Sequence, residues 1–341
     1  MLKYLKYYSI LILYIKINFI FISCSGKREA LGPDNEIRII CSGSDEKYLK
    51  EVLHIVFDDT LYTPEPEPYY YLKFSRPDKY SKLKNQAYLI IAALNHDLEN
   101  EGSQLINKIL PNDQYFINEN QQPIYLTKDT YSRNQILMII NGLNIDHVKK
   151  SIIEKKEFIK KQFLEQHQLR QEKYILGDND QNKIKDMITA KNDWSFSIPW
   201  GWEVIVNSSD SGFVWIGKEM PFQWMSVSWD SGSYIDNELI AGSYIWNMPE
   251  KNYKNVRFNN YKFNLKKTKF INHDAWLIEG LWETINDVES KGGPFRSYLF
   301  YDKIKNQTYH INMLIFHPGN NKSLYIRQMD MMARTFRFLN S

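Results

Sequence analysis

Cysteine is scarce in this chain of 341 residues, which contains only Cys24 and Cys41. Two thiols can form at most one bridge, so the fold cannot depend on a disulfide framework and must be stabilised by packing. The hydrophobic content of 43% and the aromatic content of 15% are enough for large cores. A chain of this length is expected to fold as two domains.

The sequence also lacks the short motifs that mark most metal and nucleophile sites. Its seven histidines show no H-x-H or H-E-x-x-H spacing. The Asp178-Asn179-Asp180 start of a calcium loop has Lys183 where such loops need glycine. Ser44 and Lys47 have the S-x-x-K spacing of penicillin-binding enzymes, but the companion S-D-N is missing, and helix capping explains Ser44 better. We therefore predict no metal, no cofactor and no catalytic residue.

Residues 1–23 have the layout of a secretory signal, with lysines at the start, an apolar run and a small residue before Cys24. The end of this leader resembles a bacterial lipoprotein signal, in which the cysteine is acylated and becomes the mature N-terminus. Lys16 and Asn18 interrupt the apolar run and make it a poor permanent span. We predict lipidation at Cys24 and a lipid-anchored protein in the inner or outer membrane of a bacterial cell envelope. An uncleaved membrane anchor and a soluble chain are the alternatives.

Once the leader is removed, the chain has no net excess of positive or negative charge. The whole chain is formally +3, and the leader holds three lysines and no acid, so its removal leaves a neutral chain. A neutral chain without a basic block gives no electrostatic reason to bind nucleic acid. Residues 24–35 are predicted to form a short tether between the anchor and the fold.

Two α+β domains are predicted after the tether, each an antiparallel-rich sheet with packed helices. The first, 36–177, ends in a long helix that starts at residue 145 and has apolar residues at helical spacing. The second, 178–341, contains all nine tryptophans, seven strand candidates and a closing helix over 325–336. Its order of elements faintly resembles PsbP-type α-β-α sandwiches.

Residues 275–302 predict two strands joined by a polar loop that ends in Gly292-Gly293-Pro294. Both faces of the first strand are apolar at its middle, so we expect a central strand covered on both sides. The GLWE and GGPFRSYLFYD segments, together with CSGSDE, TPEPEPYY and GFVWIGKE, resemble the DUF4837 family of Bacteroidetes-type envelope lipoproteins, a domain of unknown function. This resemblance covers nearly the whole mature chain. It implies an exported, membrane-anchored protein and identifies no catalytic residue.

Glu279 lies in mid-strand among apolar neighbours, so its carboxylate needs a cationic or hydrogen-bonding partner. Arg296, early in the next strand, has the guanidinium nearest in sequence that could pair across the hairpin. We predict a pair between Arg296 and Glu279 or Glu283. Such a pair could brace the sheet, line a ligand site or serve acid–base catalysis.

The tryptophans could stack on sugar rings or pack against a partner protein, although about two-thirds of them are expected in the core. The predicted binding surface consists of Trp200, Trp202, Trp215, Trp282, Glu279, Glu283 and Arg296. We predict a non-catalytic binding or assembly module that contacts the lipid bilayer through acylated Cys24 and an envelope protein or glycan through this surface. The alternatives are a hydrolase or other enzyme acting on envelope glycan or peptide polymers, and a structural partner of an outer-membrane complex.

Overall fold

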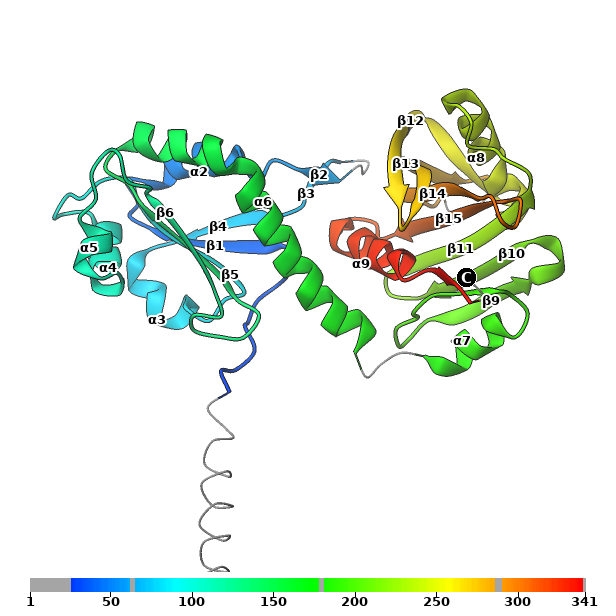
Figure 1. Cartoon of the computed structure of the whole chain (residues 1–341), viewed down its shortest axis with the longest axis horizontal. Helices are drawn as coiled ribbons and strands as arrows, with labels where there is room; N and C mark the ends of the chain where they lie inside the picture. Colours follow the sequence, from blue (N-terminus) through cyan, green and yellow to red (C-terminus); the bar gives the residue numbers. More distant parts are fainter. Residues whose placement is uncertain (1–25, 62–64, 178–180, 286–289, 340–341) are drawn as a thin grey trace, which may run out of the picture. The chain divides into compact units, whose positions relative to one another are not determined.

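The computed structural model describes residues 26–61, 65–177, 181–285 and 290–339 (Figure 1). The predicted leader and the predicted lipidation site at Cys24 lie outside these residues. No helix in the described part of the chain combines the length and the apolar character that a membrane crossing needs. The chain is of the α+β class and rich in antiparallel pairs, which confirms the predicted class. The prediction of an antiparallel-rich sheet in the first domain was wrong, because the central strands of that sheet pair in parallel.

By its internal contacts the chain divides into two units. The N-terminal unit contains Met1–Pro33, Ile37–Lys47 and Lys73–Ser151, and the C-terminal unit contains Asp34–Glu36, Tyr48–Leu72 and Ile152–Ser341. This grouping differs from the predicted division after residue 177. Most of the long helix, and the segment that leads into the fourth strand, group with the C-terminal strands.

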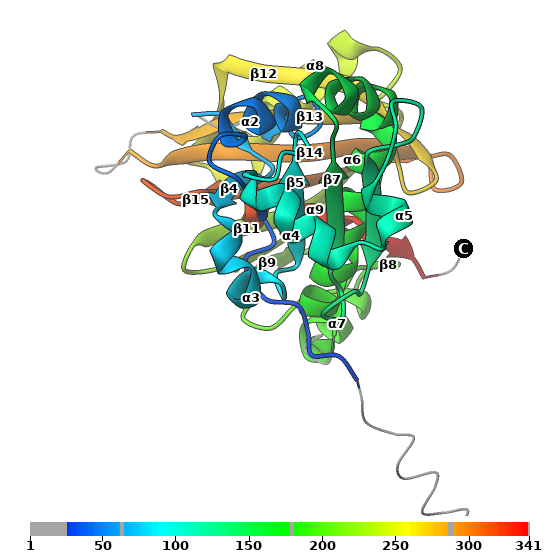
Figure 2. The ribbon, with the colours of Figure 1, turned by 90° about the vertical axis from the view of Figure 1, so that its left-hand side faces the viewer.

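A five-stranded sheet forms the centre of the N-terminal unit, in the order β4-β1-β5-β7-β6 (Figure 2). Its strands are β1 (Glu36–Cys41), β4 (Tyr71–Ser75), β5 (Tyr88–Ala93), β6 (Ile124–Lys128) and β7 (Ile136–Asn141). β5 pairs in parallel with both β1 and β7, whereas β6 pairs antiparallel to β7. The centre of this sheet is therefore parallel, because helices intervene between its strands in the sequence. Every residue of β5 and β7 is buried, as their continuous apolar runs predict.

Short helices accompany this sheet, and the best capped of them is α4 (Glu101–Ile109). The Asn100 side chain accepts a hydrogen bond from the Ser103 N–H at 3.0 Å. Buried Asp45, which follows β1, accepts hydrogen bonds from the Leu94 N–H and the Asn100 amide. The other helical elements of this unit are η1 (Pro77–Lys79), α3 (Tyr80–Leu83) and α5 (Asn112–Tyr115). Helix α2 (Glu46–His54) begins in this unit, and its residues from Tyr48 onward group with the C-terminal unit.

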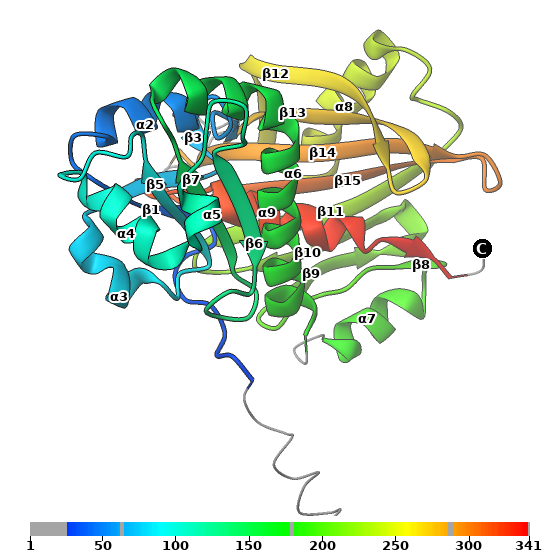
Figure 3. The ribbon, with the colours of Figure 1, turned by 60° about the vertical axis from the view of Figure 1, so that its left-hand side comes forward.

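An antiparallel sheet of seven strands forms the centre of the C-terminal unit, in the order β12-β13-β14-β15-β11-β10-β9 (Figure 3). The strands are β9 (Glu203–Ser208), β10 (Phe213–Lys218), β11 (Phe222–Ser231), β12 (Val256–Phe270), β13 (His273–Thr284), β14 (Gly292–Asp302) and β15 (Gln307–Phe316). This unit also contains α7 (Asn182–Thr189), η2 (Ser209–Ser211), α8 (Glu238–Tyr253), α9 (Ser323–Arg334) and most of α6 (Ile145–Leu176). Two short strand pairs belong to it as well: β2 (Thr60–Leu61) with β3 (Glu67–Pro68), and β8 (Trp194–Ser195) with β16 (Arg337–Phe338).

Two apolar cores lie on the two faces of this sheet. One contains Trp194, Tyr298 and Met329, and the other contains Ile245 of α8 with Trp282. Alternate residues of β13 enter different cores, so this strand is covered on both faces, as its sequence predicts. Figure 3 shows α9 over one face of the sheet and α8 at the β12 end, and the two helices belong to the cores on opposite faces.

The predicted loop end at Gly292-Gly293-Pro294 belongs to strand β14 instead. Neither glycine has a positive φ, so conformational freedom is not the reason for glycine here. A Cβ at Gly293 would lie 2.1 Å from the carbonyl oxygen of Ile315, which leaves no room for any side chain. The two glycines therefore allow close packing of neighbouring strands.

Candidate functional site

Arg296 and Glu279 lie directly opposite each other on β14 and β13. The Arg296 side chain donates to Glu279 Oε1 from Nε at 2.8 Å and from Nη2 at 2.5 Å. Nη2 also lies 3.1 Å from the Tyr69 hydroxyl, and Nη1 lies 3.5 Å from Asp330 of α9. The structure thus contains the pair between Arg296 and Glu279 that the sequence of the hairpin predicts. It adds a second carboxylate, that of Asp330, which the sequence does not indicate.

This buried polar cluster has the properties of a structural brace. Burial by itself would raise the pKa of Asp330, but the positive charges of Arg296 and Arg334 hold it below its ordinary value. The Tyr298 hydroxyl donates to Asp330 at 2.5 Å, and Arg334 donates to both of them. The cluster joins strands β13 and β14 to helix α9, and its charges are compensated by one another.

Glu283 belongs to a different arrangement. Its carboxylate accepts hydrogen bonds from Asn259 at 3.0 Å and from Arg257 at 2.8 Å, both on β12. The hydrogen bond from Asn259, with help from Arg257, lowers the pKa of Glu283 despite a small opposing effect of burial. Glu279 and Glu283 therefore do not converge on Arg296, and they do not form the pair of carboxylates that acid–base catalysis would need.

The predicted tryptophan surface divides into buried and exposed members. Trp202 and Trp282 are 3% and 1% exposed and belong to the cores. Trp215 is partly buried and packs edge-on against Trp224, with ring centroids 5.4 Å apart. Trp200, in the turn before β9, is 74% exposed. Of the four predicted tryptophans, Trp200 is the one that presents most of its ring to solvent.

Trp200 forms one wall of a hollow of about 520 Å³, which we call the Trp200 hollow. Its apolar lining comes from exposed Trp200, Ile205 and Phe222 and from partly buried Trp224. The polar part of its lining consists of Glu203, Lys218 and Glu219, and the two glycines Gly201 and Gly217 complete it. Rigid aromatic rings beside a few polar groups are typical of ligand-binding hollows of this size.

The hollow lies on the face of the sheet that carries Trp215 of β10 and Trp224 of β11. Tyr253, the last residue of α8, packs edge-on against Trp215 on this face, with ring centroids 4.9 Å apart. Gly217 lies between two side chains there, because a Cβ on it would come within 2.5 Å of Ile205 Cδ1 and 3.0 Å of Trp224 Cδ1. Any side chain at this position would displace the lining of the hollow.

A second hollow of about 440 Å³ adjoins the first, and both are lined by Trp200, Gly201 and Glu203. Its other walls come from helix α7, through Ile184 and Met187, and from buried Trp202. Trp200 therefore stands between two hollows at the β9 edge of the sheet. This position makes its ring available to a ligand in either of them.

The described residues offer little for metal or nucleophilic chemistry. Among them, no group of three or more histidine, cysteine or acidic residues is placed to hold a metal ion. The Ser44 hydroxyl lies 3.2 Å from both the Ser42 hydroxyl and Asp45. Burial, with a smaller contribution from nearby acids, raises the pKa of Cys41 to about 12, so its sulfur is a protonated thiol at neutral pH.

Sequence reasoning missed several of the residues that line the Trp200 hollow, including Ile205, Gly217 and Phe222. The available signal was Gly217 itself, a glycine near the end of an otherwise β-branched and aromatic strand. Strand periodicity could not show which residues of neighbouring strands would line a common hollow.

Comparisons with known proteins agree with the predicted family resemblance. Residues 180–335 match the model of the family DUF4837, a domain of unknown function. The matched range includes the GFVWIGKE, GLWE and GGPFRSYLFYD segments and leaves out CSGSDE and TPEPEPYY, so it is narrower than the predicted resemblance. No curated protein matches the chain.

Three solved structures show weak likeness. A mutant of the protein Mog1 is 8% identical with a TM-score of 0.32, covering 44% of this chain and 92% of its own. The Ran-binding protein Mog1p of Saccharomyces cerevisiae is 7% identical with a TM-score of 0.31, covering 43% and 90%. A protein of Bacteroides thetaiotaomicron is 13% identical with a TM-score of 0.25, covering 43% and 45%. Likenesses this low carry no argument about fold or function.

Proposed function

We propose that this protein is a lipid-anchored, non-catalytic binding module of the bacterial cell envelope, and that the Trp200 hollow contacts a glycan polymer of that envelope. The observation that carries this proposal is the 74% exposure of Trp200 between two adjoining hollows. An exposed tryptophan loses apolar contacts that the core would provide, so its position favours a ligand that covers the ring.

The lining of the hollow favours a sugar ring as that ligand. A sugar presents an apolar C–H face that can stack on the indole of Trp200 or on Phe222. Its hydroxyl groups can donate hydrogen bonds to Glu203 or Glu219 and accept one from Lys218, all of which line the same hollow. Apolar platforms beside carboxylate and ammonium groups therefore suit a glycan better than a purely apolar ligand.

A hydrolytic role has less support. It would be favoured by a deep polar pocket around Glu279, Glu283 and Arg296. Instead, Arg296 is paired with Glu279 and Asp330, and Glu283 is paired with Arg257 and Asn259. Neither of the hollows beside Trp200 is lined by any of these three residues.

Binding can be tested by sedimenting the full-length chain, in mild detergent, with purified peptidoglycan sacculi. We expect the wild type to sediment with the sacculi and Trp200→Ala to bind roughly tenfold more weakly, because the stacking platform is lost. Trp246→Ala is the matched control, since Trp246 is 39% exposed but lines neither hollow beside Trp200. Equal sedimentation of Trp200→Ala and wild type would place the contact elsewhere, and release of soluble glycan fragments would favour the hydrolase.

The lipid anchor needs a separate experiment. Cells expressing the full-length chain should incorporate labelled palmitate into it, and Cys24→Ala should abolish the label. Cys41→Ala is the control, because Cys41 is buried and should not be acylated. Label that survives Cys24→Ala would contradict the anchor while leaving the glycan-binding proposal intact.

A further inference from the structure

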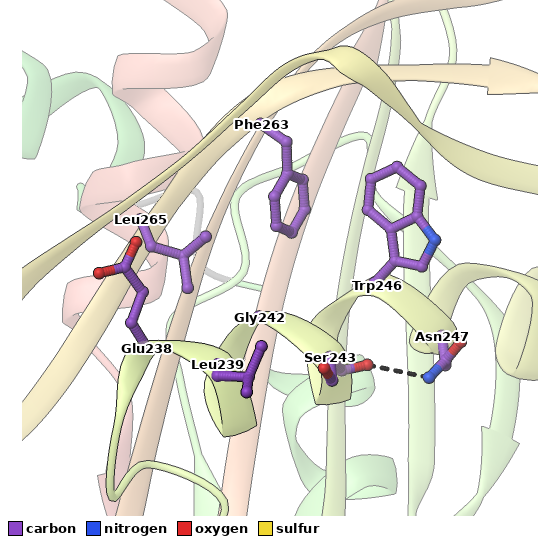
Figure 4. A pocket seen from close by; sticks show the side chains of 8 residues that line it. All are labelled: Glu238, Leu239, Gly242, Ser243, Trp246, Asn247, Phe263 and Leu265. Carbon is purple, nitrogen blue, oxygen red and sulfur yellow. Dashed lines mark hydrogen bonds between the residues drawn. The ribbon is translucent and has the colours of Figure 1, made fainter.

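A third hollow, which is apolar and distinct from both hollows beside Trp200, lies between helix α8 and strand β12. We call it the α8–β12 groove; its volume is about 560 Å³. Figure 4 shows the Phe263 and Leu265 side chains of β12 directed toward α8, with the Trp246 indole beside them. The Trp246 and Phe263 rings pack edge-on with centroids 5.1 Å apart. Leu239, 79% exposed, lines the groove as well.

Gly242 keeps the helix side of the groove open. It lies within α8, where glycine is a poor helix former, and it faces Leu265. A Cβ at this position would lie 3.6 Å from Leu265 Cδ2, an ordinary contact. Alanine would therefore fit without strain, whereas a larger side chain would occupy the space that a ligand would use.

The second wall of the groove is formed by β12, an edge strand of the seven-stranded sheet. β12 stands last in the strand order and pairs with β13 on one side. Its pairing is regular from Phe263 to Phe270, so this stretch has a second edge of backbone N–H and C=O groups that faces away from β13. An edge strand beside a helix, with an apolar groove between them, is an arrangement that accepts an extended peptide as an additional strand.

Charge determines which kind of peptide fits. β12 contains four lysines and one arginine and no acidic residue. Lys266, Lys267 and Lys269 are exposed and lie in the regular stretch. Lysines on an edge strand discourage indiscriminate strand pairing, and the same charges favour a partner that carries carboxylates. Because side chains alternate along a strand, Lys266 lies on the face opposite to Phe263 and Leu265.

We propose that the α8–β12 groove binds an extended, acidic peptide segment as an eighth strand of the sheet. Its apolar side chains, at every second position, would enter the groove beside Phe263, Leu265 and Trp246. Its intervening carboxylates would face Lys266 on the other face. This proposal concerns a protein partner and a surface separate from the Trp200 hollow, so it does not depend on glycan binding.

The test uses the full-length chain in phosphatidylcholine nanodiscs and a fluorescein-labelled ten-residue peptide that alternates isoleucine and glutamate. Fluorescence anisotropy should show saturable binding. Two N-methylated versions give the sharpest comparison, because methyl groups on the isoleucine nitrogens block one edge of the peptide and methyl groups on the glutamate nitrogens block the other. We expect one version to bind at least about tenfold more weakly and the other to bind like the parent.

Protein variants locate the site. Gly242→Leu should abolish binding by filling the groove, while Gly242→Ala should fold at least as stably as the wild type. Lys266→Glu should weaken binding about fivefold or more at low salt. Lys183→Glu, on an exposed face of α7, is the matched control and should bind like the wild type. A peptide with lysine in place of glutamate should bind more weakly than the parent peptide.

Several results would overturn the proposal. Equal binding of the two methylated peptides would exclude strand pairing, and equal binding of the lysine peptide would exclude the charge argument. Binding unchanged in both Gly242→Leu and Lys266→Glu would place the peptide elsewhere. A photoreactive benzoylphenylalanine in place of Leu239 should crosslink to the peptide. If it crosslinks instead to lipid in nanodiscs that contain phosphatidylglycerol, the groove faces a membrane and not a peptide.

Discussion

Arg296 of β14 and Glu279 of β13 are direct cross-strand partners, and two nitrogens of the guanidinium donate to the same carboxylate oxygen. The Arg296 side chain is 10% exposed and that of Glu279 is 28% exposed, so the pair lies at the margin of the core. Asp330 on α9 approaches the arginine from a second element. The cluster therefore fixes helix α9 to the sheet, and the positive charge of Arg296 compensates the negative charges of Glu279 and Asp330.

Arg296→Met should destabilise the C-terminal unit by about 3 kcal/mol or more, because it leaves two carboxylates without their shared partner. Arg257→Met removes the exposed pair with Glu283 and should cost about 1 kcal/mol or less. Urea unfolding followed by tryptophan fluorescence reports on the C-terminal unit, where all nine tryptophans lie. Equal losses for the two variants would contradict the role of Arg296 as a brace.

Buried His310 should make the fold sensitive to mild acid. Burial lowers its pKa from 6.5 to about 3 in the folded state, whereas the unfolded chain takes up the proton near pH 6.5. The contribution of this histidine to stability is therefore complete above about pH 6.5. It falls by about 1.4 kcal/mol per pH unit as the pH decreases toward 3.

His310→Gln should reduce this slope in urea unfolding measured between pH 7 and pH 4. His317→Gln is the matched control, because His317 is not buried in the folded state. The prediction fails if the slope of the His310→Gln variant equals that of the wild type over the whole range.

The larger features of the C-terminal unit could be predicted from the sequence because they depend on local period. Seven runs of strand-forming residues correspond to the seven strands of the sheet, and the predicted helix at 325–336 corresponds to α9. The predicted long helix that starts at residue 145 corresponds to α6, although the prediction assigned it to the first domain and most of it groups with the C-terminal unit. The pair between Glu279 and Arg296 followed from a buried carboxylate in one strand of a hairpin. Each of these features is set by residues close together in the sequence.

Features that depend on distant segments could not be predicted in the same way. Asp330 reaches Arg296 from a helix that follows two further strands, and no local pattern indicates that approach. Strands β1, β5 and β7 pair in parallel because they run in the same direction. A buried apolar run in the sequence indicates a strand but not its direction relative to its neighbours. The α8–β12 groove depends on where α8 lies against the sheet, and the Trp200 hollow depends on where the turn before β9 lies against strands β10 and β11.

The same substitution at two glycines should have opposite effects on stability. Gly293→Ala places a Cβ 2.1 Å from the backbone carbonyl oxygen of Ile315, which cannot move away as a side chain can, and should destabilise the fold by about 1–3 kcal/mol. Gly242→Ala improves helix propensity without a close contact and should stabilise it by about 0.5–1 kcal/mol. Thermal unfolding of the two variants checks both signs. A destabilised Gly242→Ala would show that α8 has less space beside Leu265 than described.

Two neighbouring tryptophans should separate binding from folding. Trp202 is 3% exposed, so Trp202→Ala should cost about 3–5 kcal/mol of stability. Trp200 is 74% exposed, so Trp200→Ala should change stability by about 0.5 kcal/mol or less while weakening binding to sacculi. Urea unfolding and sedimentation with sacculi check the two effects on the same preparations. A large loss of stability in Trp200→Ala would show that this ring supports the fold.

The most direct test of the Trp200 contact is fluorine NMR of the full-length chain labelled with 5-fluorotryptophan. Trp200→Phe assigns the Trp200 signal, and a soluble disaccharide–peptide fragment of peptidoglycan is then titrated in. We predict that the Trp200 signal shifts in a saturable way, while the signals of buried Trp194 and Trp276 stay in place. A Trp200 signal that does not move, at fragment concentrations that saturate binding to the wild-type chain, would contradict the proposed contact surface.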